Sequence, residues 1–209
     1  MPPLPPGTVT QAIAVVTAVA FLIVWASSLQ PLVSVAGGFI PARASGLVEL
    51  PGALPVWLTP LSATFIHAGL LHLAFNMLMF VYVGRFVESV IGGWASAGLY
   101  VIGAYAAALL HWLIEPGSTT PMVGASGAIS ATFGAYAVFF GRDRTEGIGP
   151  LSGYAVRILW LASAWIFVQA LIGIAALGGV QVAIFAHIGG FVAGLVLARP
   201  LLMWRYRGA

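Results

Sequence analysis

The sequence predicts an all-α membrane protein built from six transmembrane helices, with both termini in the cytoplasm. Its 209 residues are 61% hydrophobic and only 6% charged, with a mean hydropathy of +1.04. That composition lies outside the range of soluble globular domains. Six apolar stretches follow one another, and arginines are unevenly shared between the segments that connect them. These observations indicate a helical bundle in which any functional site lies among the spans.

The predicted spans are separated by one long connection and several short ones. They cover residues 10–29, 70–90, 94–114, 126–140, 154–177 and 182–203. The fourth is short for a hydrocarbon core that takes about 20 residues to cross. Residues 1–9 are expected to be a tail, and residues 30–66 to be a first outer loop whose apolar side chains lie partly in the membrane interface. We expect residues 1–209 to form a single membrane domain.

Charge predicts the orientation, because arginines accumulate on the cytoplasmic side of membrane proteins. With both termini inside, only Arg43 faces outward, and the other seven arginines face the cytoplasm: Arg85, Arg142, Arg144, Arg157, Arg199, Arg205 and Arg207. The basic pI, near 9.7, therefore reports topology, and no nucleic-acid partner is expected. The chain has no cysteine, which excludes disulfides, thiolate catalysis and cysteine metal sites.

Four polar residues within the spans are candidates for function, because such groups are costly in a membrane. His72 and Asn76 lie in the second span, Ser126 begins the fourth, and His187 lies in the sixth. All three spans run inward from the outer face, so each of these residues is expected within about 10 Å of an outer helix end. Three helices thus bring their polar groups to one depth.

Their spacing indicates a serine hydrolase. Small-residue stripes on the fourth span (Ser126, Ser130, Gly134) and the sixth (Ala183, His187, Gly190, Gly194, Ala198) permit close helix approach. Packed together, they could place His187 as general base beside the Ser126 nucleophile. His72 and Asn76, four residues apart on one helix face, together with the Ser126 backbone N–H, are candidate donors to an oxyanion.

These residues resemble the motifs of the rhomboid intramembrane serine proteases. The matching residues are His67, His72 and Asn76 in or before the second span, Gly124-Ala125-Ser126-Gly127, and Ala186-His187-Ile188-Gly189-Gly190 with Gly194. The resemblance covers residues 60–198 and implies a rhomboid-like six-helix bundle with a Ser126–His187 dyad and His72 and Asn76 in the oxyanion hole. It also implies a loop-stabilising role for His67 and a structural role for Gly84 and Glu88.

Two positions depart from the family pattern. Ser130 stands where some members carry an aromatic residue that stacks on the base, and Ala42 precedes Arg43 where many members have a Trp-Arg pair. No carboxylate lies near His187 in the sequence, so packing is expected to orient its ring. His111, next to Trp112 and Glu115, is expected to be an interfacial residue. Glu88 is expected to pair with Arg85 or to cap a helix.

Other interpretations stay open. The glycine-flanked Ser126 is also typical of plain helix packing, and Asn76 of a hydrogen bond between helices. A haem or metal protein could use His67, His72, His111 and His187, and a coupled transporter would need a mid-membrane carboxylate that the spans lack. A catalytically inactive rhomboid-like binding or chaperone protein is the main alternative.

The resemblance implies cleavage of single-span membrane proteins in or near the outer end of their transmembrane segments, through an acyl-enzyme. Helix-weak residues such as Gly and Pro are expected there, because the peptide must be extended to be cleaved. No metal or organic cofactor is expected. The partners are transmembrane substrates and membrane lipid, and the sequence leaves the oligomeric state open. The abundance of Ala, Gly and Arg points to a bacterial plasma membrane, with the active site toward its outer face.

Overall fold

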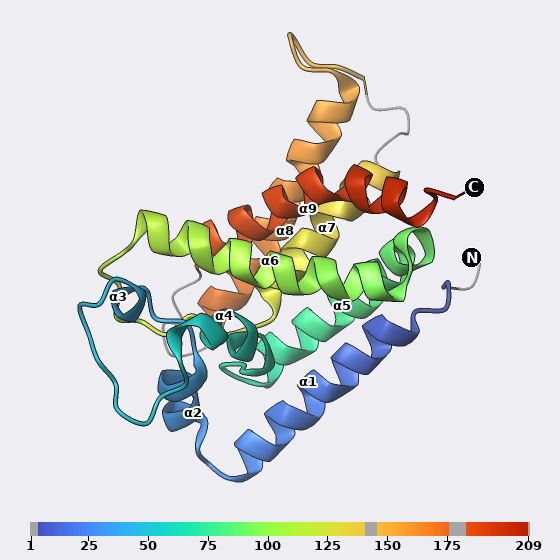
Figure 1. Cartoon of the computed structure of the whole chain (residues 1–209). Helices are drawn as coiled ribbons and strands as arrows, with labels where there is room; N and C mark the ends of the chain where they lie inside the picture. The colour runs from blue at the N-terminus through green and yellow to red at the C-terminus, as the bar shows by residue number, and fades with distance from the viewer. Residues whose placement is uncertain (1–3, 141–145, 176–182, 209) are drawn as a thin grey trace.

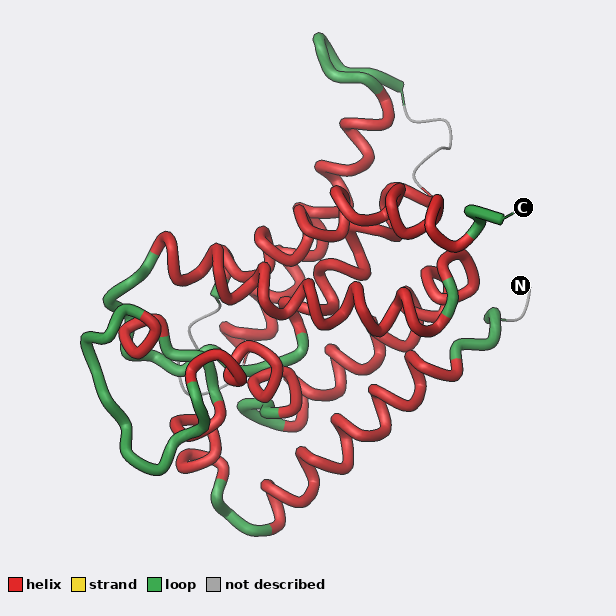
Figure 2. The backbone as a smooth tube through the Cα atoms, in the orientation of Figure 1, coloured by secondary structure: helices red, strands yellow, loops and turns green. Residues whose placement is uncertain are grey.

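Helices account for the regular secondary structure of the computed structural model, which describes residues 4–140, 146–175 and 183–208 (Figures 1 and 2). The long helices are α1 (Thr8–Ala26), α5 (Leu70–Ile91), α6 (Gly93–Ile114), α7 (Ser126–Phe140), α8 (Gly153–Ala175) and α9 (Ile184–Arg205). Shorter helices between α1 and α5 are α2 (Gln30–Gly37), α3 (Pro41–Ala44), η1 (Val56–Leu58), α4 (Thr59–Ser62) and η2 (Ala63–Phe65).

The protein is an integral membrane protein by the length and composition of its helices. Among the described residues, α1, α5, α6 and α9 are each long and apolar enough to cross a membrane, and apolar helices also begin at Ser126 and Gly153. Large apolar side chains on their outer faces are exposed, among them Ile23, Leu78 and Val196. Such faces are stable against lipid rather than water. The count of six spans stays a prediction.

The long helices begin and end within three residues of the predicted spans where the structure describes them. Two predictions lie outside the described residues: the cytoplasmic position of Arg142 and Arg144, and the span ends at residues 177 and 182. Both described termini lie at the same end of the molecule, on the right in Figure 1. Arg85 on α5 donates hydrogen bonds to the carbonyls of Leu4 and Pro5 at this end.

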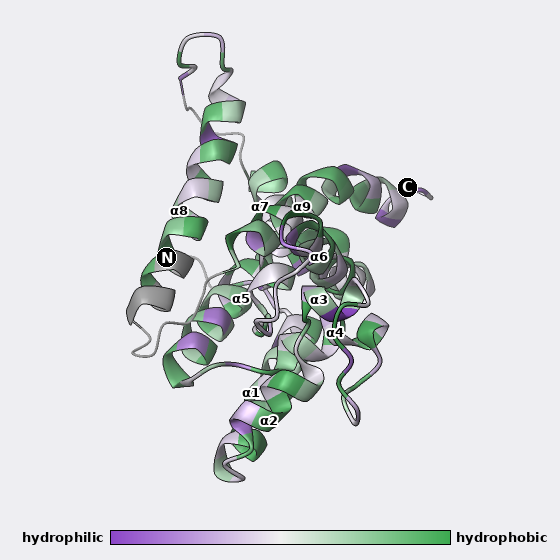
Figure 3. Ribbon diagram, turned by 90° about the vertical axis from the view of Figure 1, so that its left-hand side faces the viewer, coloured by the Kyte–Doolittle hydropathy of each residue, from purple (hydrophilic) through white to green (hydrophobic). Residues whose placement is uncertain are grey.

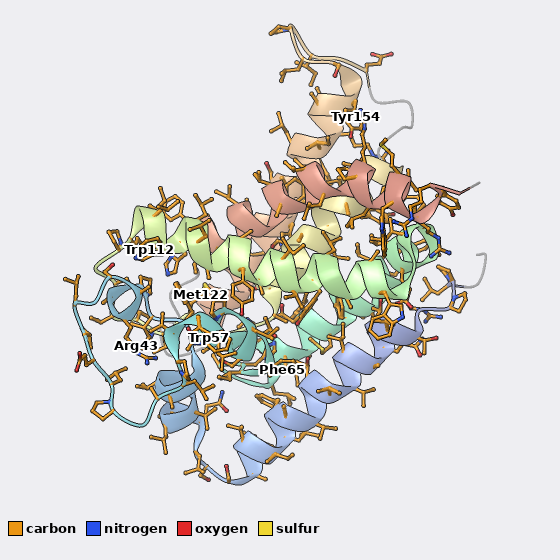
Figure 4. All side chains as sticks on the ribbon, in the orientation of Figure 1. Arg43, Trp57, Phe65, Trp112, Met122 and Tyr154 are labelled. Atoms are coloured by element: carbon orange, nitrogen blue, oxygen red, sulfur yellow. The ribbon has the colours of Figure 1, made fainter. Side chains whose placement is uncertain are left out.

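The segment 30–66 is more ordered than the loop that the sequence predicted. Its short helices α2, α3 and α4 form a layer at the end of the bundle opposite the termini, where Arg43 and Trp57 lie in Figure 4. Trp112 donates a hydrogen bond to the Ser45 hydroxyl, and Tyr105 donates one to the Trp57 carbonyl. These bonds fasten the layer to α6. Leu47 and Trp57 stay exposed, which suits a segment partly in the interface.

The centre of the bundle is the mutual packing of α6, α7 and α9, where glycines let backbones touch. A Cβ on Gly190 or Gly194 of α9 would lie 2.0 Å from the carbonyl oxygen of Gly127 or Ala131 on α7. A Cβ on Gly103 of α6 would lie 2.5 Å from the Cβ atom of Ala131. Real side chains do not approach so closely, so these positions require glycine. The small-residue stripes predicted for the fourth and sixth spans therefore face each other.

Glu88 joins α5 to the start of α1 as a cap rather than as a partner of Arg85. Its carboxylate accepts hydrogen bonds from the backbone N–H groups of Val9 and Thr10 at 3.0 and 2.8 Å, and from the Thr10 hydroxyl at 2.7 Å. These donors are among the first-turn N–H groups that a helix cannot satisfy itself, and a carboxylate there also suits the helix dipole. A Cβ on Gly84 would contact Thr10, so Gly84 permits this approach.

α8 is the long helix least attached to the others. It stands to one side of the bundle in Figure 3, and Tyr154 near its start lies far from Arg43 and Trp57 in Figure 4. Among its described side chains only Trp165 is buried, whereas Trp160 and Phe167 are exposed. Its attachment to the bundle therefore depends strongly on the Trp165 contacts.

We expect Gly194→Ala to lower the melting temperature of the purified protein, because the added methyl group would meet the Ala131 carbonyl and overpacking costs about 1–3 kcal/mol. Gly98→Ala is the matched control: it is also a helical glycine, but a Cβ there would have no neighbour within 4 Å. It should leave the melting temperature unchanged or raise it. Equal behaviour of the two variants would contradict the role given to Gly194.

Candidate active site

Ser126 and His187, predicted as nucleophile and base, are in direct contact. The Nε2 atom of His187 on α9 lies 2.8 Å from the Oγ atom of Ser126, the first residue of α7. Both residues are largely enclosed: His187 is 4% exposed and Ser126 is 7% exposed. The Nδ1 atom of His187 is buried and has no hydrogen-bond partner among the described residues. This geometry allows an imidazole to take a proton from a hydroxyl.

The chain enters α7 through a fixed turn. Gly124 has φ of +115°, a conformation that favours glycine, and its N–H donates to the Ala63 carbonyl at 2.9 Å. The N–H of Ala125 donates to the Nε2 atom of His67 at 3.4 Å. These two bonds hold the residues before Ser126 against the segment that precedes α5. They agree with the loop-stabilising role predicted for His67.

His72 lies close to Ser126. Its Nδ1 atom accepts a weak hydrogen bond from the Ala68 N–H at 3.4 Å, which leaves the ring proton on Nε2. The missing Cβ of Gly124 marks a point 2.8 Å from His72 Nε2 and 3.7 Å from Ser126 Oγ. A glycine at this position thus leaves space between a ring N–H donor and the serine oxygen. An oxyanion formed at Ser126 would be within reach of that donor.

Asn76 lies one turn below His72 on the same face of α5 and is fully buried. Its side-chain N–H donates to the His72 carbonyl at 2.8 Å, and its Oδ1 atom has no partner among the described residues. This bond joins two turns of α5. The alternative prediction for Asn76, a hydrogen bond between two helices, is therefore not the bond that this N–H makes. The second N–H of the amide remains available as a donor.

Ser130 links the start of α7 to α8. Its hydroxyl donates to the Ser126 carbonyl at 2.7 Å and accepts a hydrogen bond from the Trp165 indole N–H, also at 2.7 Å. The Trp165 ring stacks on Phe133 with centroids 4.3 Å apart. At the position where some relatives carry an aromatic residue, this chain therefore has a hydroxyl that holds an aromatic side chain from another helix.

The family of the chain follows from comparison with known proteins. Residues 55–204 match the family model of the Rhomboid domain, which is well over half of the sequence. The chain belongs to the rhomboid family. The three motifs described above all fall within the matched residues.

Individual relatives agree with this assignment. RHOMBOID-like protein 4 of Arabidopsis thaliana is 30% identical over 148 residues, which are 71% of this chain and 35% of that protein. The proteins named Rhomboid protease GlpG from Pectobacterium atrosepticum and Klebsiella pneumoniae are 30% and 31% identical over 139 residues, 66% of this chain and 46% of each relative. The chain thus matches less than half the length of these relatives.

One expectation for this rhomboid chain is wrong. The His111 side chain does not face the membrane interface, because it is 6% exposed and its Nδ1 atom is buried without a partner among the described residues. The sequence carried a signal for this position, because Gly103, Ala107 and His111 recur every four residues on α6 and so share a face. Trp165 was also missed, since nothing in the sequence distinguishes it from the exposed Trp160.

A metal centre was among the alternatives for the histidines. Within the part of the chain that the structure describes, no group of three His, Cys, Asp or Glu side chains could hold a metal ion. The rings of His67 and His72 pack edge to face at 5.0 Å, and His187 contacts a serine. His67 and His72 are thus engaged in ring packing, and His187 in contact with a serine.

His67, which lies before α5 and outside the spans, must stay uncharged for the turn to form. Burial, and next the nearby His72, lower the pKa of His67 from 6.5 to about 3. The unfolded chain therefore binds a proton at this position between these two pH values and the folded chain does not. This contribution to stability is complete above about pH 6.5 and is lost as the pH falls toward 3.

We predict that His67→Gln, which keeps a side-chain oxygen near the position of Nε2 to accept the Ala125 N–H, reduces the pH dependence of stability. Melting temperatures of the native chain should fall more than those of the variant between pH 7 and pH 4.5, by roughly 5 °C. Parallel curves for the two proteins would show that the His67 proton does not contribute.

Proposed function

We propose that this rhomboid is an intramembrane serine endopeptidase acting through a Ser126–His187 dyad. The observation that carries the proposal is the 2.8 Å contact between Ser126 Oγ and His187 Nε2 in an enclosed site. Burying polar side chains inside a membrane protein costs free energy. A buried hydroxyl in contact with an imidazole is therefore a candidate functional site. The names of the bacterial relatives as proteases support the same function.

The reaction follows from the positions of the groups. Ser126 Oγ attacks the carbonyl carbon of a peptide bond while His187 Nε2 takes the hydroxyl proton. The tetrahedral oxyanion receives hydrogen bonds from His72 Nε2–H, the free N–H of Asn76 and the backbone N–H of Ser126. His187 then returns the proton to the leaving amine, whose C–N bond breaks. Water, deprotonated by the same imidazole, hydrolyses the resulting ester and restores Ser126.

The substrates proposed are single-span membrane proteins, cut in or near the outer end of the transmembrane segment. The site lies at the end of the bundle that carries the 30–66 layer, opposite the described termini. The arginine distribution favours the orientation in which this end faces outward and both termini are cytoplasmic. In this view residues 1–209 form one six-span domain of a bacterial plasma membrane.

The competing function is a catalytically inactive rhomboid-like protein that binds membrane partners. An inactive member that retains both dyad residues must have them misaligned. The 2.8 Å contact between the two side chains favours the enzyme over this alternative.

We expect the purified native protein in lipid to react with a fluorophosphonate probe, and Ser126→Ala and His187→Ala to be unlabelled, because the probe requires an activated serine. Ser89→Ala is the matched control, since Ser89 lies at the far end of α5 and its hydroxyl donates to the Phe86 carbonyl of its own helix. It should be labelled like the native chain. Labelling of Ser126→Ala, or no labelling of the folded native protein, would favour the inactive alternative.

We further expect His72→Ala and Asn76→Ala each to lower kcat for a transmembrane reporter in liposomes by roughly 10²-fold with little change in KM, because each removes a donor to the oxyanion. Leu78→Ala, a truncation on the lipid-facing side of the same helix, should have no such effect. Unchanged kcat in either test variant would remove that residue from the oxyanion hole and leave the dyad in place.

A further inference from the structure

His111 lies level with the catalytic pair. Gly103 of α6 packs against Ala131 of α7. One turn further along α6, Ala107 packs against Gly127, which lies one turn closer to the start of α7. The next step of four on α6 is His111, and the next on α7 passes Ser126 into the turn that precedes it. His111 therefore faces the start of α7, about one helical turn beyond Gly127.

Contact with α9 places His111 at the same depth. Gly189 packs against the Ala106 carbonyl and the Leu110 side chain of α6. His187 lies two residues, about 3 Å, further toward the outer end of α9, and His111 lies one residue beyond Leu110 in the same direction. The His111 and His187 rings are within electrostatic range of each other. Two independent helix contacts thus place the two histidines at the same depth of the bundle, and both residues are buried.

Each ring has a buried nitrogen without a partner. Among the described residues, neither His187 Nδ1 nor His111 Nδ1 makes a hydrogen bond. To act as a base at Nε2, His187 must carry its proton on Nδ1, which makes Nδ1 a buried donor that lacks an acceptor. Such a donor is costly, and more so once the ring gains its second proton in the reaction. The chain offers no carboxylate there, and Ser130 replaces the aromatic residue that could hold the ring.

We propose that His111 is a positioning residue for His187: its Nδ1 atom accepts a hydrogen bond from His187 Nδ1–H through one water molecule held between the two rings. This inference rests on the proposed function of the dyad. The bridge satisfies both orphan nitrogens and fixes the proton of His187 on the nitrogen away from Ser126. Buried waters of this kind bind where two or more polar groups are otherwise unsatisfied.

The surroundings suit this assignment. Glu115, one turn further along α6 and exposed, interacts electrostatically with His111. His72 of α5 also interacts electrostatically with His187 and carries its own ring proton on Nε2.

The test uses two substitutions that separate acceptor from shape. His111→Asn keeps an oxygen near the Nδ1 position, whereas His111→Phe keeps the ring and loses the acceptor. We expect His111→Phe to lower kcat for the transmembrane reporter about 10-fold at unchanged KM, as loss of a group that fixes a histidine tautomer does elsewhere, and His111→Asn to retain most of it. Leu113→Ala, on the exposed side of the same turn, is the control and should match the native chain.

A merely structural role predicts the opposite order, with Phe tolerated and Asn destabilising in a buried position. That order, or equal activity of both variants, would overturn the proposal. Melting temperatures measured in parallel identify any variant that is unfolded.

A second measurement does not depend on activity. The chain has four histidines, so selective ¹⁵N-histidine labelling gives few imidazole signals, each assigned by its own substitution. The His187 signal should report a proton on Nδ1 in the native chain and a mixture of tautomers in His111→Phe. An unchanged His187 signal would overturn the proposal, whereas an unreactive native Ser126 with a changed signal would overturn the proposed function alone.

Discussion

Direct backbone contact between α7 and its neighbours α6 and α9 is the constraint on which the rest of the structure depends. The hydrophobic effect does not drive helices together in lipid, so close packing and polar contacts must do so. Gly190 and Gly194 bring α9 against the carbonyls of α7, and the same approach sets the distance from His187 to Ser126. The site is thus a product of the helix packing rather than of a flexible loop. The distance between the two side chains is therefore set by the positions of α7 and α9.

The same packing explains the role of polar groups beside the dyad. Ser126 is held through its carbonyl by Ser130, whose hydroxyl also receives the Trp165 indole. His67 holds the turn before Ser126 through Ala125. Each of these bonds satisfies a polar group that lipid and apolar side chains could not. The cost of burying the polar groups is thereby offset by bonds that also position the nucleophile.

The sequence predicted the long helices and the contact between Ser126 and His187, because hydropathy and small-residue spacing are local signals. It did not predict the order within 30–66, since short helices between prolines depend on contacts such as Trp112 with Ser45. It placed His111 at the interface from its neighbours Trp112 and Glu115, although its spacing from Gly103 and Ala107 indicated burial. Trp165 could not be distinguished from Trp160, because both lie on one apolar helix and only tertiary packing separates them.

The glycine contacts also limit how this protein can diversify. A position where any Cβ meets a neighbouring backbone tolerates no gradual enlargement, so substitutions of these glycines on α6, α7 and α9 are expected to destabilise the bundle. α8 and the 30–66 layer have no such constraint over most of their exposed surface. Sequence variation among descendants of this chain is therefore expected to accumulate on α8 and in that layer. Such variation would leave the packing of α6, α7 and α9 unchanged.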